Sequence, residues 1–285
     1  MKTATHEVKS PLPDFKDPPV VEVALSVQFE PLSSLSTSDL AVYWNDILRR
    51  EYKWKEASPI PTTLEWFGLP QPKLPTSFEF SVQPLETPPP HRALFFSKDE
   101  TALIQLQRDR FVRNWRKANQ TPYCRYESIR ASFREQFESF CSFVAKSSLG
   151  ACVPNQCEVT YVNHIPWGRE GQPREDLSEV LSAWANANSG PALNTPESVD
   201  VTARYPIMDS AGTTPVGRLH VAANHAYRTD DLQPILALTL TARGRPASEG
   251  LDDVMAFLDR AREHVARGFA AMTTTTMHQR WGRRA

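Results

Sequence analysis

Hydrophobic and polar residues alternate along the stretch that follows the two prolines at positions 18 and 19. Every second residue is apolar: Val21, Val23, Leu25, Val27 and Phe29. A period of two places these side chains on one face of an extended chain. The pattern predicts a strand that is buried on one face, and proline is tolerated where a strand begins.

Two longer stretches repeat apolar residues at steps of three and four. The first, from about Tyr126 to Ser147, carries Ile129, Phe133, Phe137, Phe140 and Val144. The second, from Gly250 to about Ala271, carries Leu251, Val254, Met255, Leu258, Val265 and Phe269. This spacing is typical of an amphipathic helix. Such apolar faces are usually buried against a sheet, so we expect both helices to cover one.

Shorter patterns predict the remaining elements. A helix after the first strand can be capped by Ser38, and its apolar face holds Leu40, Tyr43, Trp44, Ile47 and Leu48. Residues 53–76 contain prolines at 59, 61, 70, 72 and 75 and predict a loop with at most a short strand near 64–67. A second short helix carries Leu177, Val180, Leu181 and Trp184. Further strands are expected at 78–82, 92–97, 102–107, 111–116, 157–165, 199–208, 217–227 and 235–242.

The order of these elements repeats along the 285 residues. Residues 18–148 and 155–272 each read as a strand, a helix, several antiparallel strands and a long helix. We therefore expect an α+β protein of two related halves, with the helices on one face of antiparallel sheet. The order is similar to that of the TATA-binding protein, and a helix-grip cup is the alternative. Residues 1–17 are expected to form a loose arm and residues 273–285 a tail.

Composition narrows the class of protein. The 32 basic and 33 acidic side chains nearly cancel, whereas a dedicated nucleic-acid binder usually has a basic excess. The four cysteines form no zinc or disulfide pattern, so we expect free thiols, no metal and no cofactor. No apolar run is long enough for a membrane span, and the first residues contain no apolar stretch of the kind found in a secretory leader. A cytoplasmic protein is expected.

Four short segments resemble a sporadically distributed family of uncharacterised bacterial proteins. They are Pro18-Pro19-Val20-Val21-Glu22, Asn114-Trp115-Arg116, Tyr123-Cys124-Arg125-Tyr126 and His278-Gln279-Arg280-Trp281-Gly282. The resemblance spans nearly the whole chain but departs at Cys124, where the family has proline. It implies a common fold and length and supplies no activity. A sporadic distribution is typical of accessory functions such as defence or toxin–antitoxin modules.

Arginine-rich residues 108–117 make the first candidate site. Basic, polar and aromatic side chains gather here: Arg110, Arg113, Asn114, Trp115 and Arg116, followed by Tyr123 and Tyr126. Arginines beside aromatic rings can clamp a phosphate and stack a base. Alternate residues of a strand face opposite sides, so at most half of them can line one pocket. The alternative is that Trp115 is a core residue and that Arg116 pairs with a carboxylate such as Glu127.

Histidines and a C-terminal tryptophan make two further candidates. Tyr161, Asn163 and His164 could approach His220, Asn224 and His225 on a sheet, where histidines can bind a metal or act as bases. His220 and His225 differ in strand parity, however, which favours a structural role. Trp281 can either fix the tail to the body of the protein or anchor a partner.

No nucleophile elbow, phosphate loop or dinucleotide motif is present in the sequence. We therefore expect a non-catalytic binding or adaptor protein, with another protein as its partner and homodimerisation as a way to cover strand edges. Two alternatives stay open. One is nucleotide or nucleic-acid binding through residues 108–117, and the other is a hydrolase that uses His164 and His225.

Overall fold

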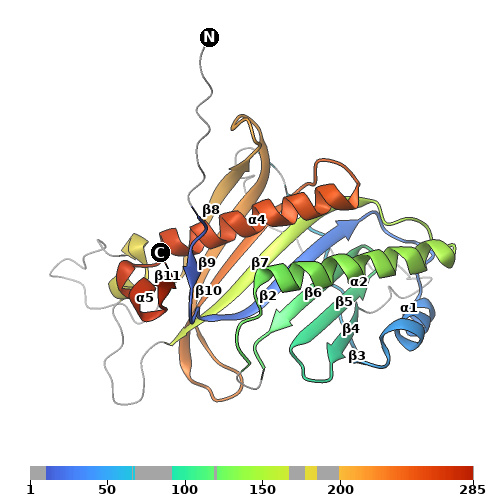
Figure 1. Ribbon diagram of the computed structural model, residues 1–285, viewed down its shortest axis with the longest axis horizontal. Helices are drawn as coiled ribbons and strands as arrows, with labels where there is room; N and C mark the ends of the chain where they lie inside the picture. Colours follow the sequence, from blue (N-terminus) through green and yellow to red (C-terminus); the bar gives the residue numbers. More distant parts are fainter. Residues whose placement is uncertain are drawn as a thin grey trace, which may run out of the picture.

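Nine antiparallel strands form one large sheet in the computed structural model, and two long helices lie across one face of it (Figure 1). The structure describes residues 11–65, 67, 92–118, 121–166, 177–184 and 199–284. Two very short strands form a second sheet beside the ends of the chain. The expected α+β class, with antiparallel sheet, is confirmed.

The large sheet has the strand order β3-β4-β5-β6-β2-β7-β10-β9-β8. The strands of its first part are β2 (Val20–Phe29), β3 (Tyr52–Ala57), β4 (Arg92–Ser97), β5 (Ala102–Gln107) and β6 (Arg110–Arg116). Those of its second part are β7 (Pro154–Pro166), β8 (Val201–Met208), β9 (Pro215–Tyr227) and β10 (Pro234–Gly244). The helices are α1 (Thr37–Tyr43), the π-helix η1 (Trp44–Leu48), α2 (Tyr126–Lys146), α3 (Leu177–Val180), the 3-10 helix η2 (Ser182–Trp184), α4 (Leu251–Met272) and α5 (Thr275–Arg280).

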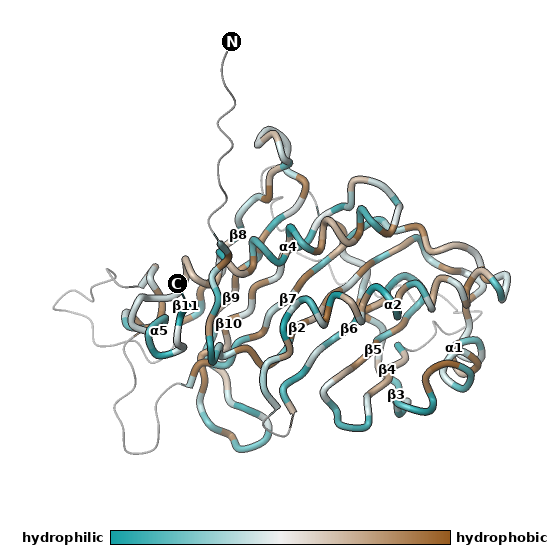
Figure 2. Tube along the Cα trace, in the orientation of Figure 1, coloured by the Kyte–Doolittle hydropathy of each residue, from teal (hydrophilic) through white to brown (hydrophobic). Residues whose placement is uncertain are grey.

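The core lies between the sheet and the helices α2 and α4. Val23, Leu25 and Val27 of β2 have no exposed surface, because their face of the strand lies under these helices. Phe133 and Phe140 of α2 are equally buried, as the step of three and four predicted. Figure 2 shows hydrophobic residues along β2 and β7, beneath the two helices.

The sequence-based prediction differs from the structure at α1 and β3. Ser36, rather than Ser38, caps α1, and it exchanges hydrogen bonds with Asp39 in a capping box. The π-helix that follows α1 changes the helical register, so Ile47 is exposed instead of lying on the apolar face. Strand β3 lies where a loop was expected, because the exposed lysines of this edge strand hide its alternation. The strand expected at 78–82 lies outside the described residues.

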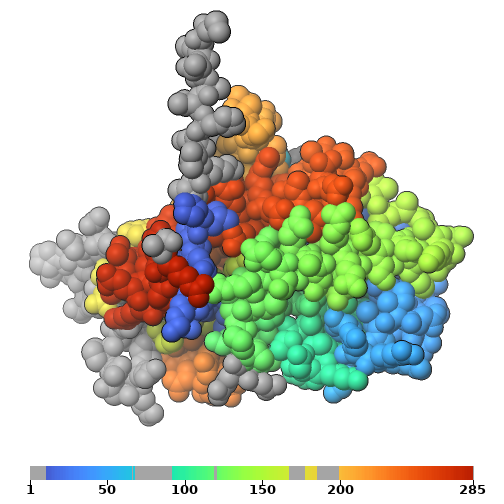
Figure 3. Space-filling model, viewed as in Figure 1, coloured from blue at the N-terminus to red at the C-terminus, as the bar shows by residue number. Residues whose placement is uncertain are grey.

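The two ends of the chain meet in the small sheet. Asp14 and Phe15 form β1, which pairs with Arg283 and Arg284 of β11. The described part of the segment expected to be a loose arm is therefore packed, with Phe15 6% exposed. Figure 3 shows this N-terminal segment, in dark blue, between the C-terminal tail and the start of α2. Among the described residues, no helix has the length and apolar character that crossing a bilayer requires.

Candidate functional site

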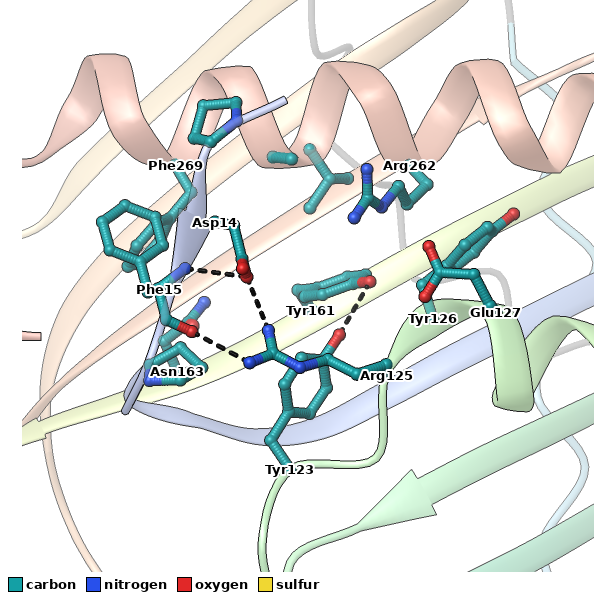
Figure 4. A pocket seen from close by; sticks show the side chains of 14 residues that line it. Asp14, Phe15, Tyr123, Arg125, Tyr126, Glu127, Tyr161, Asn163, Arg262 and Phe269 are labelled. Atoms are coloured by element: carbon teal, nitrogen blue, oxygen red, sulfur yellow. Dashed lines mark hydrogen bonds and ion pairs between the residues drawn. The ribbon is translucent and has the colours of Figure 1, made fainter. Parts of the chain in front are cut away.

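A cleft of about 330 Å³ opens between β1, the start of α2, β7 and α4 (Figure 4). Its volume lies in the range of small-molecule sites. Polar and charged side chains line one part of it and apolar side chains the other. We call this space the cleft, and it is lined by Pro13, Asp14, Phe15, Pro18, Tyr123, Arg125, Tyr126, Glu127, Tyr161, Asn163, Arg262, Val265, Ala266 and Phe269.

Three tyrosines supply neutral hydrogen-bonding groups to the cleft. The hydroxyls of Tyr123 and Tyr161 lie 3.2 Å apart, and Tyr126 donates to Asp259 of α4 at 2.9 Å. The pKa of each of the three phenols is raised above the ordinary value for tyrosine, and burial is the main cause. These phenols are therefore protonated at neutral pH, where they bind ligands by hydrogen bonds and do not act as bases.

The two arginines of the cleft differ in how they are held. The Arg125 guanidinium donates to the Asp14 carboxylate at 2.6 Å and to the Phe15 carbonyl at 3.3 Å. Arg262 lies over the Tyr126 ring, with 5.4 Å from its Cζ to the ring centroid, and its charge acts to lower the pKa of Tyr161. No carboxylate of the described residues forms an ion pair with Arg262. It is thus a cation at the cleft that a ligand can neutralise.

The apolar part of the cleft is fixed by the C-terminal tail. Phe15 packs edge-on against Phe269 at 5.5 Å between ring centroids and against Trp281 at 6.1 Å. Trp281 is 7% exposed, and its ring lies 5.1 Å from that of Phe269. In this structure Trp281 therefore fixes the tail to the body of the protein, the first of its two expected roles.

The residues of the arginine-rich segment 108–117 lie on opposite faces of the sheet, as strand alternation requires. Arg113 and Trp115 of β6 are buried on the helix side, and Trp115 contacts the ring of Tyr123 at 5.2 Å between centroids. Burial lowers the pKa of Arg113. Arg110, Asn114 and Arg116 lie on the face turned away from α2 and α4, which we call the open face, and Asn114 is buried there, at 3% exposed.

The histidine candidates are not brought together. His164 of β7 and Asn224 of β9 both lie opposite Ala237 of β10, so their side chains point to the same face of the sheet. His225 follows Asn224 in β9 and therefore points to the other face, away from His164. His225 accepts a hydrogen bond from the backbone of Val199 at 3.1 Å. Burial and the charge of Arg228 lower the pKa of His164. Within the described residues, no cluster of potential metal ligands is found.

Sequence reasoning found Tyr123, Tyr126 and Tyr161 but missed Arg262. Arg262 lies four residues after Leu258 and three before Val265, both of which are buried on the apolar face of α4. A charged residue in the middle of an apolar helical stripe is the signal that could have identified it. The contribution of Asp14 and Phe15 had no such signal, because it depends on the pairing of the two chain ends.

No model of a known protein family matches this chain, and no curated protein matches it in sequence. Its function is therefore inferred from the geometry of its own residues.

Proposed function

We propose that this is a non-catalytic binding protein whose cleft holds a small anionic ligand with an apolar or aromatic body. The observation that carries the proposal is Arg262, a cation with no carboxylate partner among the described residues, beside Tyr161 in the lining of the cleft. A carboxylate or phosphate group fits this pair, because a guanidinium and a phenol both donate hydrogen bonds to oxyanions.

The apolar lining supports the second feature of the ligand. Phe15, Val265, Ala266 and Phe269 line the same cleft, so a ligand that pairs with Arg262 also meets apolar surface. The protonated phenols and the fixed ion pair of Arg125 with Asp14 support binding rather than proton transfer. The protein partner and homodimer expected from the sequence stay predictions.

We also propose that the chain consists of two related halves. The order β2-β6-β5-β4 on one side of the sheet corresponds to β7-β10-β9-β8 on the other, and β2 and β7 are neighbours at the centre. Each series ends in a long helix, α2 or α4. Superposing β2, β6, β5 and α2 on β7, β10, β9 and α4 tests this proposal, and a reversed strand or displaced helix contradicts it.

Native mass spectrometry of the protein purified from its own host tests the proposed binding function. We expect a bound small acid at one equivalent, and its loss from an Arg262→Gln variant. Arg260→Gln, two residues away on the same helix and outside the cleft, is the matched control and should keep the ligand. A ligand retained equally by both variants would contradict a role for Arg262, and proteins retained by all three forms would identify partners.

A further inference from the structure

Strand register defines rows of side chains on the open face, on the other side of the sheet from the cleft, and Leu103 and Asn114 in the middle of one row are buried. Residues directly opposite each other in neighbouring strands point to the same side of a sheet. One such row crosses all nine strands, from Lys53 on β3 through Phe96, Asn114 and Thr160 to His220 and Arg204 on β8. Its side chains are largely polar, unlike those of the helix-covered face.

Positive charge on this surface exceeds what its carboxylates neutralise. Lys53 and Lys55 are exposed on β3, Arg116 lies on β6 and Arg204 on β8, and none of the four forms an ion pair with a described residue. Of the carboxylates on the same face, Glu158 pairs with Arg243 at 2.5 Å, and Glu22 lies directly opposite Arg116 and accepts a hydrogen bond from Asn114 at 2.5 Å. A surface of this kind attracts a polyanion although the whole chain is nearly neutral.

An oxyanion already occupies one end of the open face. Residues 59–65, which we call the strap, run across the open face from β5 to β9. The side chains of Gln107 on β5 and Gln28 on β2 donate to the carbonyls of Ile60 and Thr63, and the Glu65 backbone donates to Gln156 of β7 at 2.7 Å. The Glu65 carboxylate, in a residue 6% exposed, forms an ion pair with Arg218 and a hydrogen bond with His220 at 2.9 Å. Arg218 and His220 thus form an anion site that the chain fills with its own side chain.

At the β3 end of the row, Phe96 offers a surface on which a flat ring can stack. Phe96 is half-buried, with Lys55 Nζ 5.0 Å and Arg116 Cζ 5.7 Å from its ring centroid. Aromatic rings and guanidinium planes on an open sheet are stacking surfaces for unpaired bases, and adjacent cations hold the phosphates. An acidic polypeptide would use the cations but has no need of the ring.

We propose that the open face binds single-stranded nucleic acid. Phosphates pair with Lys53, Lys55 and Arg116 on one flank and with Arg204 on the other, and a base stacks at Phe96. The Glu65 carboxylate of the strap competes with phosphates for Arg218, which lies on the same flank as Arg204. This proposal does not depend on a ligand in the cleft.

Fluorescence anisotropy with a fluorescein-labelled oligothymidylate of about 20 nucleotides tests the proposal at about 50 mM and about 200 mM salt. We expect measurable binding that weakens with salt. The variant Lys53→Gln/Lys55→Gln/Arg116→Gln should lose at least about tenfold in affinity, and its salt slope should fall by about 2. The matched control Arg50→Gln/Arg134→Gln/Lys146→Gln removes as many charges outside the open face and should bind normally.

A substitution in the strap should raise affinity for the oligonucleotide, whereas the open-face substitutions should lower it. Glu65→Gln should increase affinity for the oligonucleotide several-fold, because the carboxylate that competes for Arg218 loses its charge. If the triple variant does not fold, Lys53→Gln/Lys55→Gln replaces it, since both lysines are exposed. Absence of binding by the native protein would overturn the proposal, as would equal losses in the open-face and control variants. Binding of polyglutamate, but not of the oligonucleotide, would instead identify an acidic polypeptide as the partner and also overturn it.

Discussion

Arg130 of α2 and Asp259 of α4 form a two-point ion pair, with Nε–Oδ1 at 2.7 Å and Nη2–Oδ2 at 2.9 Å. Asp259 Oδ1 also accepts the hydrogen bond from Tyr126. The pair therefore links the two long helices beside the cleft and fixes one of its phenols. A bidentate guanidinium–carboxylate contact defines orientation as well as distance.

Replacing Asp259 by Ala should lower the free energy of unfolding by about 1 kcal/mol. The ion pair is partly solvated and contributes little by itself, but the buried Tyr126 hydroxyl loses its acceptor. Urea unfolding measures this change. Asp252→Ala is the control, because Asp252 also pairs with an α2 arginine, Arg134 at 2.9 Å, yet its side chain is 89% exposed. Equal losses in both variants would contradict the role given to Tyr126.

Alkaline pH should destabilise the protein through its buried phenols. The folded-state pKa values of Tyr43, Tyr123, Tyr126 and Tyr161 are raised above the unfolded value of about 10, chiefly by burial. The unfolded state therefore releases these protons first, so their stabilising contribution is complete below about pH 10 and is lost as the pH rises further.

Absorbance at 295 nm and far-UV circular dichroism, recorded together during an alkaline titration, check this pH dependence. Four of the seven tyrosines should ionise only as the secondary structure is lost. Ionisation of these four phenols near pH 10, with the fold intact, would show that they are not buried as described.

Trp115→Ala should destabilise the protein by about 3–5 kcal/mol, the usual range for removing a buried large aromatic side chain. Trp115 is 5% exposed and supports the Tyr123 ring, so the variant should also weaken ligand binding in the cleft. Thermal and urea unfolding measure the loss. A near-neutral change would place the indole on the surface and restore Trp115 as a candidate for direct binding.

Trp281→Ala should release the N-terminal segment. Besides the ring contact with Phe15, the Lys16 and Asp17 backbone amides donate to the carbonyls of Gly282 and Trp281, at 3.0 and 3.1 Å. Hydrogen exchange at residues 11–18 should therefore become faster in the variant, while β2 and β7 in the centre of the sheet stay protected. Unchanged exchange at residues 11–18 would show that β1 is held without the tail.

The local sequence pattern was sufficient to predict most of the long strands and helices, but it was not sufficient to predict the cleft. The alternation of β2 and the stripes of α2 and α4 depend on near neighbours in sequence, so the sequence predicts them directly. The cleft brings together residues from Pro13 to Phe269, and nothing local encodes this proximity. Likewise, the tail residue Trp281 and Phe15 are separated by nearly the whole chain.

Strand alternation also explains why residues 108–117 do not form one site. The sequence showed that half of them must face each side but could not show which side the helices cover. Burial of Arg113 and Trp115 on the helix side leaves Arg110 and Arg116 on the open face. The open-face row itself depends on the register of eight strand pairs, which no single-strand pattern specifies.

Paired dye titrations test whether Arg262 forms an anion site in the cleft. Anilinonaphthalene sulfonate carries an anionic group on an aromatic body, and phenylnaphthylamine has a similar body without the charge. We expect one sulfonate dye per protein, bound about tenfold more weakly by Arg262→Gln and normally by Arg260→Gln, with the neutral dye unaffected by either change. Equal binding of the sulfonate dye by the native protein and Arg262→Gln would contradict an anion site in the cleft.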